Sequence, residues 1–109
     1  MTLRTLVLLF LLFAPYPAEA QFFNYVQWSA LPPIPRAAYI AGAFDSLTGY
    51  SANEVQSKHY FICLERAAIK NTKLADNVIQ YASTHPTLQK GSVQKALLQY
   101  LIAACGKPD

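Results

Sequence analysis

The sequence lacks the short motifs from which most enzyme active sites are built. It has no Gly-x-Gly-x-x-Gly or phosphate-binding loop, no Cys-x-x-Cys, no His-Glu-x-x-His and no Gly-x-Ser-x-Gly turn. The 2 histidines, His59 and His85, fall in different predicted elements, whereas a metal site needs about three or four converging ligands. We therefore expect no catalytic residues, no metal and no cofactor, and we interpret both histidines as ordinary helix residues.

Charge is also sparse, and it is not clustered. The chain has 9 Lys or Arg and 6 Asp or Glu, a net charge of +3. No run of basic residues suggests a nucleic-acid stripe or a polybasic membrane patch. The acids are too few to favour a carboxylate pair for glycoside cleavage. The net charge alone supports only a weak preference for an acidic partner.

The sequence has no long apolar run apart from one near its N-terminus. Residues 6–14 are apolar, but they number roughly half of what crossing a bilayer requires. The run follows Arg4 and precedes Ala18-Glu19-Ala20, the pattern of a cleaved signal peptide. We expect a signal peptide over residues 1–20, a single helical domain over residues 21–109, and no membrane anchor after cleavage.

Cysteine occurs only twice, as Cys63 and Cys105. An even number in an exported chain argues for a disulfide, and a domain this small benefits from one because its core is limited. In the chain-entropy model, such a bridge stabilises by about 4 kcal/mol. The alternative is a pair of free buried thiols.

Glycine and proline divide the remaining chain into predicted helices. We expect one or two helical turns within 21–30, a proline connector over 31–35, a separate turn over 86–89, and long helices over 35–49, 51–66, 71–85 and 92–105. Ser51 with Glu54 forms a capping box, Asn71 or Thr72 caps the third long helix, and Gly106 ends the last. The fold class is all-α: a compact disulfide-stapled bundle of about four helices with a short N-terminal helical turn.

Helical spacing indicates which faces pack. One face of the first long helix carries Ile40, Ala43, Phe44 and Leu47. Another is made of small residues that predict a close neighbouring helix: Ala37, Ala38, Ala41 and Gly42. In the second long helix, one side carries Val55, Lys58, His59, Ile62 and Cys63. The last helix is apolar around most of its circumference, which predicts a central place or a surface against a partner.

Two features allow two interpretations each. Asp45, beside the apolar face, is either a buried acceptor that caps a neighbouring helix, which we favour, or a contact for a basic partner. The aromatic residues Phe22, Phe23, Tyr25 and Trp28 either cover the end of the bundle, which we favour, or form an exposed patch for a partner or a second copy.

Four segments in this order resemble the Rap1a/Tai family of small periplasmic proteins. Residues 39–45 match a Tyr-Ile-x-Gly-x-x-Asp helix, with Tyr39, Gly42 and Asp45 at the fixed positions. Residues 61–64 are similar to the family's central cysteine segment. Residues 72–78, with the tyrosine and proline that follow, look like its third helix, and residues 96–105 look like its closing helix. Family members often carry a further cysteine where Arg36 stands here, so no second bridge is expected.

The resemblance implies a disulfide-bonded periplasmic protein that neutralises a peptidoglycan-cleaving amidase toxin delivered by type VI secretion. Some members are homodimers. Such an inhibitor would cover the toxin's active site with a loop or helix end carried on a rigid bundle. The candidate contacts are Gly49, Tyr50, Ser51, Asn53, Lys70 and Asn71. The alternatives are an acid-stress-type chaperone that binds unfolded clients, and a small-ligand carrier with an internal cavity.

Overall fold

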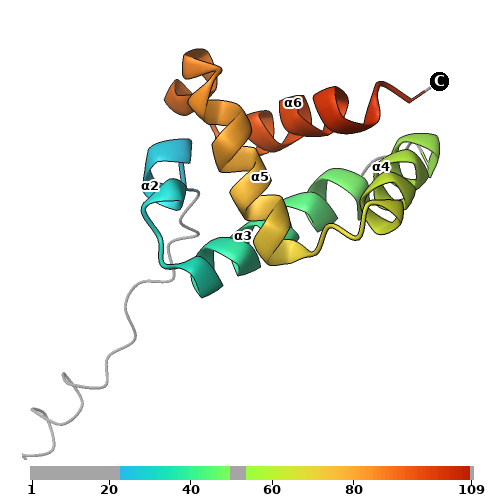
Figure 1. Cartoon of the computed structure of the whole chain (residues 1–109), viewed down its shortest axis with the longest axis horizontal. Coiled ribbons are helices and arrows are strands. Elements are labelled where there is room, and N and C mark those ends of the chain that lie inside the picture. Colours follow the sequence, from blue (N-terminus) through green and yellow to red (C-terminus); the bar gives the residue numbers. More distant parts are fainter. Residues whose placement is uncertain (1–22, 50–53, 109) are drawn as a thin grey trace, which may run out of the picture.

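Five helices and one 3₁₀ turn make up the part of the chain that the structure describes (Figure 1). The computed structural model describes residues 23–49 and 54–108. The elements within these ranges are α2 (Tyr25–Ser29), α3 (Pro33–Gly49), α4 (Glu54–Arg66), α5 (Asn71–Ser83), η1 (Pro86–Lys90) and α6 (Val93–Cys105). They include no β-strand, so the predicted all-α bundle is confirmed. The predicted signal peptide and the Ser51 capping box lie outside the described residues.

The helices pack around one core. α5 crosses α3 and leads through η1 into α6, while α4 lies against the opposite end of α3 from α2 (Figure 1). The largest fully buried side chains are Trp28, Ile40, Tyr60, Val78, Val93, Leu97 and Leu101. α6 contacts every other described element, namely α2, α3, α4, α5 and η1, and five of its side chains are buried. Its apolar circumference is therefore explained by a central place in the bundle. None of the described helices combines the length and hydropathy that crossing a bilayer requires.

The short helix α2 is fixed by a side-chain capping box and by backbone hydrogen bonds. The Asn24 side chain accepts a hydrogen bond from the Gln27 N–H at 2.8 Å, and the Gln27 side chain accepts one from the Asn24 N–H at 3.1 Å. This reciprocal pair is a capping box. The Tyr25 N–H donates to the Gly91 carbonyl at 3.0 Å, beside an antiparallel bridge between Asn24 and Ser92. These bonds join α2 to the start of α6.

The aromatic side chains of this segment pack inward. Trp28 is 0% exposed, and its Nε1–H donates to the Arg36 carbonyl at 3.0 Å. Tyr25 is buried, and the Phe23 ring packs edge-on against Tyr39. The interpretation that these aromatics cover the end of the bundle is thus confirmed for Phe23, Tyr25 and Trp28, while Phe22 lies outside the described residues.

Some of the observed helix ends agree with the ends predicted from the sequence, and others differ. α6 begins as predicted, because Ser92 accepts a hydrogen bond from the Lys95 N–H at 3.2 Å. α3 begins at Pro33, earlier than expected, because proline is tolerated in a first helical turn, where an N–H has no intrahelical partner. The predicted caps of α5 are wrong. The Leu74 N–H donates to the Lys70 carbonyl at 2.7 Å, which makes Lys70 the N-cap and Asn71 the first helical residue.

Because Tyr25 and Tyr60 are buried, we expect the free energy of unfolding to decrease at alkaline pH. Burial raises the pKa of Tyr60 above 10.0, and it does the same for Tyr25, where Arg36 partly offsets it. The folded state favours the neutral phenol, so this stabilisation is complete below the unfolded pKa and is lost as pH rises through the folded pKa. We expect the Tm to fall from about pH 10 upward, and Tyr60→Phe to flatten that fall. Identical Tm profiles for the two proteins would contradict the prediction.

Candidate functional site

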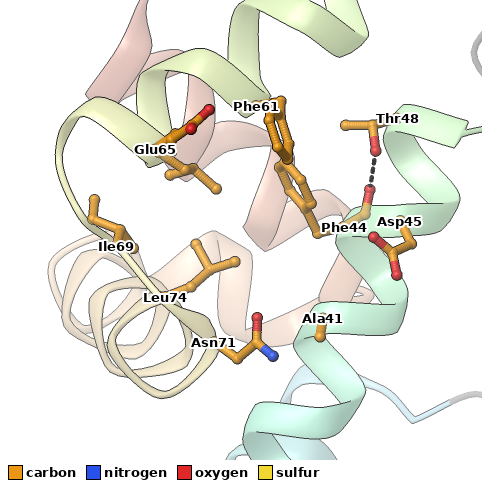
Figure 2. Close-up of a pocket in the computed structure, with 10 residues that line it drawn as sticks. Ala41, Phe44, Asp45, Thr48, Phe61, Glu65, Ile69, Asn71 and Leu74 are labelled. Atoms are coloured by element: carbon orange, nitrogen blue, oxygen red, sulfur yellow. Dashed lines mark hydrogen bonds between the residues drawn. The ribbon is translucent and has the colours of Figure 1, made fainter.

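A groove of about 450 Å³ lies between α3, α4 and the beginning of α5 (Figure 2). Its lining residues are Ala41, Phe44, Asp45, Thr48, Phe61, Leu64, Glu65, Ile69, Asn71 and Leu74. The four residues from α3 follow the i, i+3, i+4, i+7 spacing that places side chains on one helix face. One wall of the groove is therefore a continuous strip of α3.

The connection between α4 and α5 closes one end of the groove. The Ile69 N–H donates to the Leu64 carbonyl at 2.9 Å, and the Ala68 N–H donates to the Glu65 carbonyl at 3.0 Å. This pair of bonds is a Schellman motif, which is commonly accompanied by an apolar contact between the residues that occupy the Leu64 and Ile69 positions. Both of these residues line the groove. The way in which α4 ends thus shapes the groove.

Replacing Ala68 with glycine should stabilise the domain. Ala68 has a φ of 53°, the left-handed region, which costs an L-residue roughly 1–2 kcal/mol. Glycine removes that strain. It also increases the conformational entropy of the unfolded chain, which lowers the free energy of unfolding by about 0.4–1 kcal/mol. We expect Ala68→Gly to raise the free energy of unfolding by about 0.5–1 kcal/mol in a urea titration. Ala67→Gly, at a neighbouring exposed residue without a positive φ, is the control and should not stabilise; a stability loss in Ala68→Gly would contradict the prediction.

The groove combines apolar walls with an acidic rim. Phe44 and Phe61 face its interior, with Asp45 on the α3 side and Glu65 on the α4 side (Figure 2). Both carboxylates are exposed, and neither Lys nor Arg is among the lining residues. Phe61 remains 59% exposed although it is apolar. Such a site can bind a group that is apolar along its length and positively charged at its tip.

The residues that line the groove lie within a segment of the chain that matches the model of a known protein family. The family model of the Rap1a immunity proteins matches residues 34–105, from the first turn of α3 to the last residue of α6. The chain belongs to the Rap1a immunity protein family. No curated protein and no solved structure matches it. Membership confirms the predicted family and implies a protein that acts on a protein partner as an inhibitor.

The three motif residues of this member of the Rap1a immunity protein family have different surroundings. The Tyr39 hydroxyl accepts a hydrogen bond from the Phe23 N–H at 3.2 Å, so it anchors the segment before α2. Gly42 is exposed, and a Cβ added there would meet no atom within 4 Å. The prediction that this face of small residues permits a close neighbouring helix is therefore wrong at Gly42. Asp45 is exposed on the groove rim, so the favoured prediction of a buried acceptor is wrong as well.

The predicted partner contacts divide between described and undescribed residues. Gly49 ends α3 and Lys70 caps α5, while Asn71 lines the groove. Tyr50, Ser51 and Asn53 lie outside the described residues. Gly49, Lys70 and Asn71 thus lie at the ends of helices that form the groove, although no observation tests their contact with a partner.

Sequence reasoning did not single out Phe61 and Glu65 as site residues. They are four positions apart on α4, which places them on one helix face. That spacing could have paired them, but it does not indicate which helix their face meets. Among the described residues, no cluster of three or more His, Cys, Asp or Glu could hold a metal ion.

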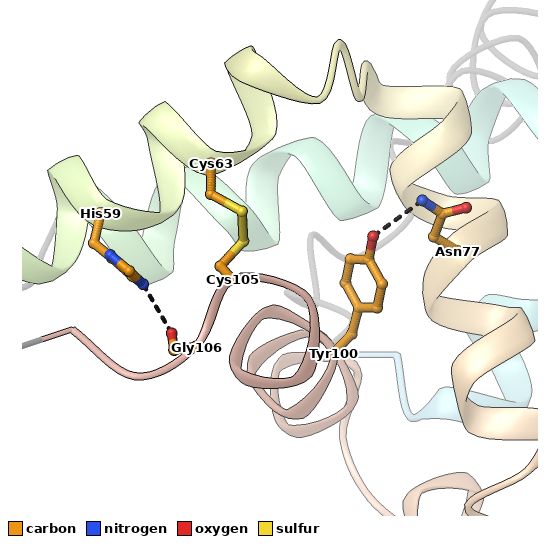
Figure 3. Close-up of a disulfide and its surroundings, with 6 residues drawn as sticks. All are labelled: His59, Cys63, Asn77, Tyr100, Cys105 and Gly106. Atoms are coloured by element: carbon orange, nitrogen blue, oxygen red, sulfur yellow. Dashed lines mark hydrogen bonds between the residues drawn. A yellow bond between two sulfur atoms is a disulfide. The ribbon is translucent and has the colours of Figure 1, made fainter.

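The predicted disulfide between Cys63 and Cys105 is present (Figure 3). Its sulfur–sulfur bond leaves the Cα atoms of the two residues 5.8 Å apart and ties α4 to the last residue of α6. Nearby, the His59 Nε2–H donates to the Gly106 carbonyl at 2.8 Å. The Asn77 amide donates to the Tyr100 hydroxyl at 3.0 Å, which links α5 to α6. α6 is therefore joined to both α4 and α5, which line the groove together with α3.

Proposed function

We propose that this chain is a periplasmic immunity protein that binds a peptidoglycan-cleaving amidase effector of type VI secretion and covers its active site. The observation that carries the proposal is the family match over residues 34–105, which includes every residue that lines the groove. The signal-peptide pattern over residues 1–20 and the disulfide support an oxidising compartment outside the cytoplasm.

A rigid surface suits inhibition by occlusion. The groove walls belong to helices whose buried residues form the common core, including Ile40 of α3, Leu64 of α4 and Leu74 of α5. A preorganised surface loses little conformational entropy when it binds, and more of the interaction energy then appears as affinity. The exposed carboxylates and Phe61 supply the polar rim and apolar centre that protein interfaces combine.

The test is inhibition of an amidase effector encoded beside this gene. We expect the purified oxidised chain to abolish peptidoglycan cleavage at a one-to-one ratio and to co-elute with the effector in size-exclusion chromatography. The eluted mass also distinguishes a bound monomer from a bound homodimer, which stays a prediction. Undiminished cleavage at tenfold excess of the chain, with no complex on the column, would rule the proposal out.

No observation favours the chaperone alternative. That alternative uses the last helix and the N-terminal aromatic residues as client-binding surfaces exposed on acid unfolding, and in the folded bundle Trp28 and the core residues of α6 are buried. Binding of unfolded clients would therefore require the bundle to open. An assay of client aggregation at low pH separates the two functions, because an immunity protein leaves that aggregation unchanged.

A further inference from the structure

We propose that the groove between α3, α4 and the beginning of α5 binds an arginine side chain presented by the effector. This inference deepens the proposed function and rests on it. It assigns an occupant to a site for which the family match specifies none.

The charge of the groove is opposite to that of the chain. The sequence carries a net charge of +3, which by itself would favour an acidic partner. The charged residues that line the groove are nevertheless Asp45 and Glu65, both carboxylates and both exposed. Within the described part of the chain, neither is engaged in an ion pair, since the carboxylate that is paired is Asp76, with Arg36 at 3.4 Å. A positively charged group on the partner therefore complements this surface.

The walls favour arginine over lysine. The groove is faced by the rings of Phe44 and Phe61 (Figure 2), and a planar guanidinium stacks on aromatic faces. It also presents several N–H donors and is more weakly hydrated than an ammonium group. Its aliphatic stem can lie along Leu64 and Ile69 while the charged end reaches a carboxylate. A volume of about 450 Å³ falls within the range of known ligand sites.

The adjoining surface of α3 leaves room for the backbone that carries such a side chain. Gly42 follows the groove residue Ala41, is exposed, and has open space where a side chain would stand. Glycine inside a helix costs roughly 0.5–1 kcal/mol relative to alanine, and no packing among the described residues explains it. A partner segment can therefore approach the helix backbone closely at this position.

The first experiment tests the groove without the effector. The full-length oxidised chain is titrated with acetyl-Leu-Arg-Leu-amide, and with the same peptide carrying citrulline, which keeps the shape of arginine but lacks its charge. We expect amide resonances of residues 41–48 and 64–74 to shift with the arginine peptide, and the citrulline peptide to bind at least about fivefold more weakly. Equal binding of the two peptides, or no shift in these residues at about 10 mM peptide, overturns the proposal.

The second experiment asks whether the effector uses the same site. The double variant Asp45→Asn/Glu65→Gln should bind the effector about tenfold more weakly than the wild type, with a smaller difference at high salt. Asp76→Asn removes a charge outside the groove and is the matched control; it should bind like the wild type. If wild-type chain binds the effector and the double variant binds equally well, the proposed occupant is wrong. If wild-type chain does not bind at all, the proposed function fails, and the peptide titration still decides the chemistry of the groove.

Discussion

Removing the disulfide should lower the free energy of unfolding by about 4 kcal/mol. The bridge joins residues separated by 42 positions, and the chain-entropy model assigns a closed loop of that size about 4 kcal/mol. Domains of this size are stabilised by only about 5–15 kcal/mol in total. The double variant Cys63→Ser/Cys105→Ser should therefore unfold at much lower urea concentration than the oxidised wild type.

The loss of protection from hydrogen exchange should be greatest in α4. This helix buries only Tyr60 and Leu64, so its position depends on the bridge more than that of α6 does. Hydrogen exchange should show the α4 amides losing the most protection in the double variant. Wild-type chain treated with reductant is the control and should behave like the variant. An unchanged urea midpoint in both would contradict the entropic argument.

Trp28→Ala should cost about 3–5 kcal/mol, the usual range for deleting a buried aromatic side chain. Trp28 is 0% exposed and donates from its indole N–H to the Arg36 carbonyl, so the substitution removes both core volume and a link between α2 and α3. It is the single tryptophan of the chain, and unfolding should therefore be followed by circular dichroism rather than by fluorescence.

Val26→Ala is the matched control in the same helix. Val26 is 60% exposed, and truncation of an exposed side chain usually changes stability by no more than about 0.5 kcal/mol. Trp28→Phe should recover a large part of the loss because it restores most of the apolar area. Equal stabilities for Trp28→Ala and Val26→Ala would show that α2 is not part of the cooperative core.

The fold could largely be predicted because its signals are local. Ser92 caps α6 through an N–H three residues away, Gly106 stops the same helix, and Pro86 follows the end of α5. Each of these acts within one helical turn and can be recognised without knowing the tertiary structure. The predicted caps of α5 failed because the backbone carbonyl of Lys70 begins the helix without help from a side chain.

The site could not be predicted in the same way, because it depends on which helix faces meet. Asp45 is adjacent to Phe44, and periodicity alone cannot tell a buried carboxylate from one on a groove rim. In α4, the side that carries Cys63 is turned toward α6 by the disulfide, whereas the buried aromatic residue is Tyr60. The packing of α4 against α3 and α6 decides both outcomes, and that packing is a property of the assembled bundle.

The antiparallel β-bridge between Asn24 and Ser92, which joins α2 to the start of α6, has a consequence for the order of folding. α5, η1 and α6 are consecutive in the chain and pack on one another, so their contacts form over short loops and can form quickly. The docking of α2 on the η1–α6 junction instead closes a loop that includes nearly all the other helices, and its entropic cost is met only when they are already assembled. We therefore expect the contact of α2 with the η1–α6 junction to form after α3, α4 and α5 have assembled.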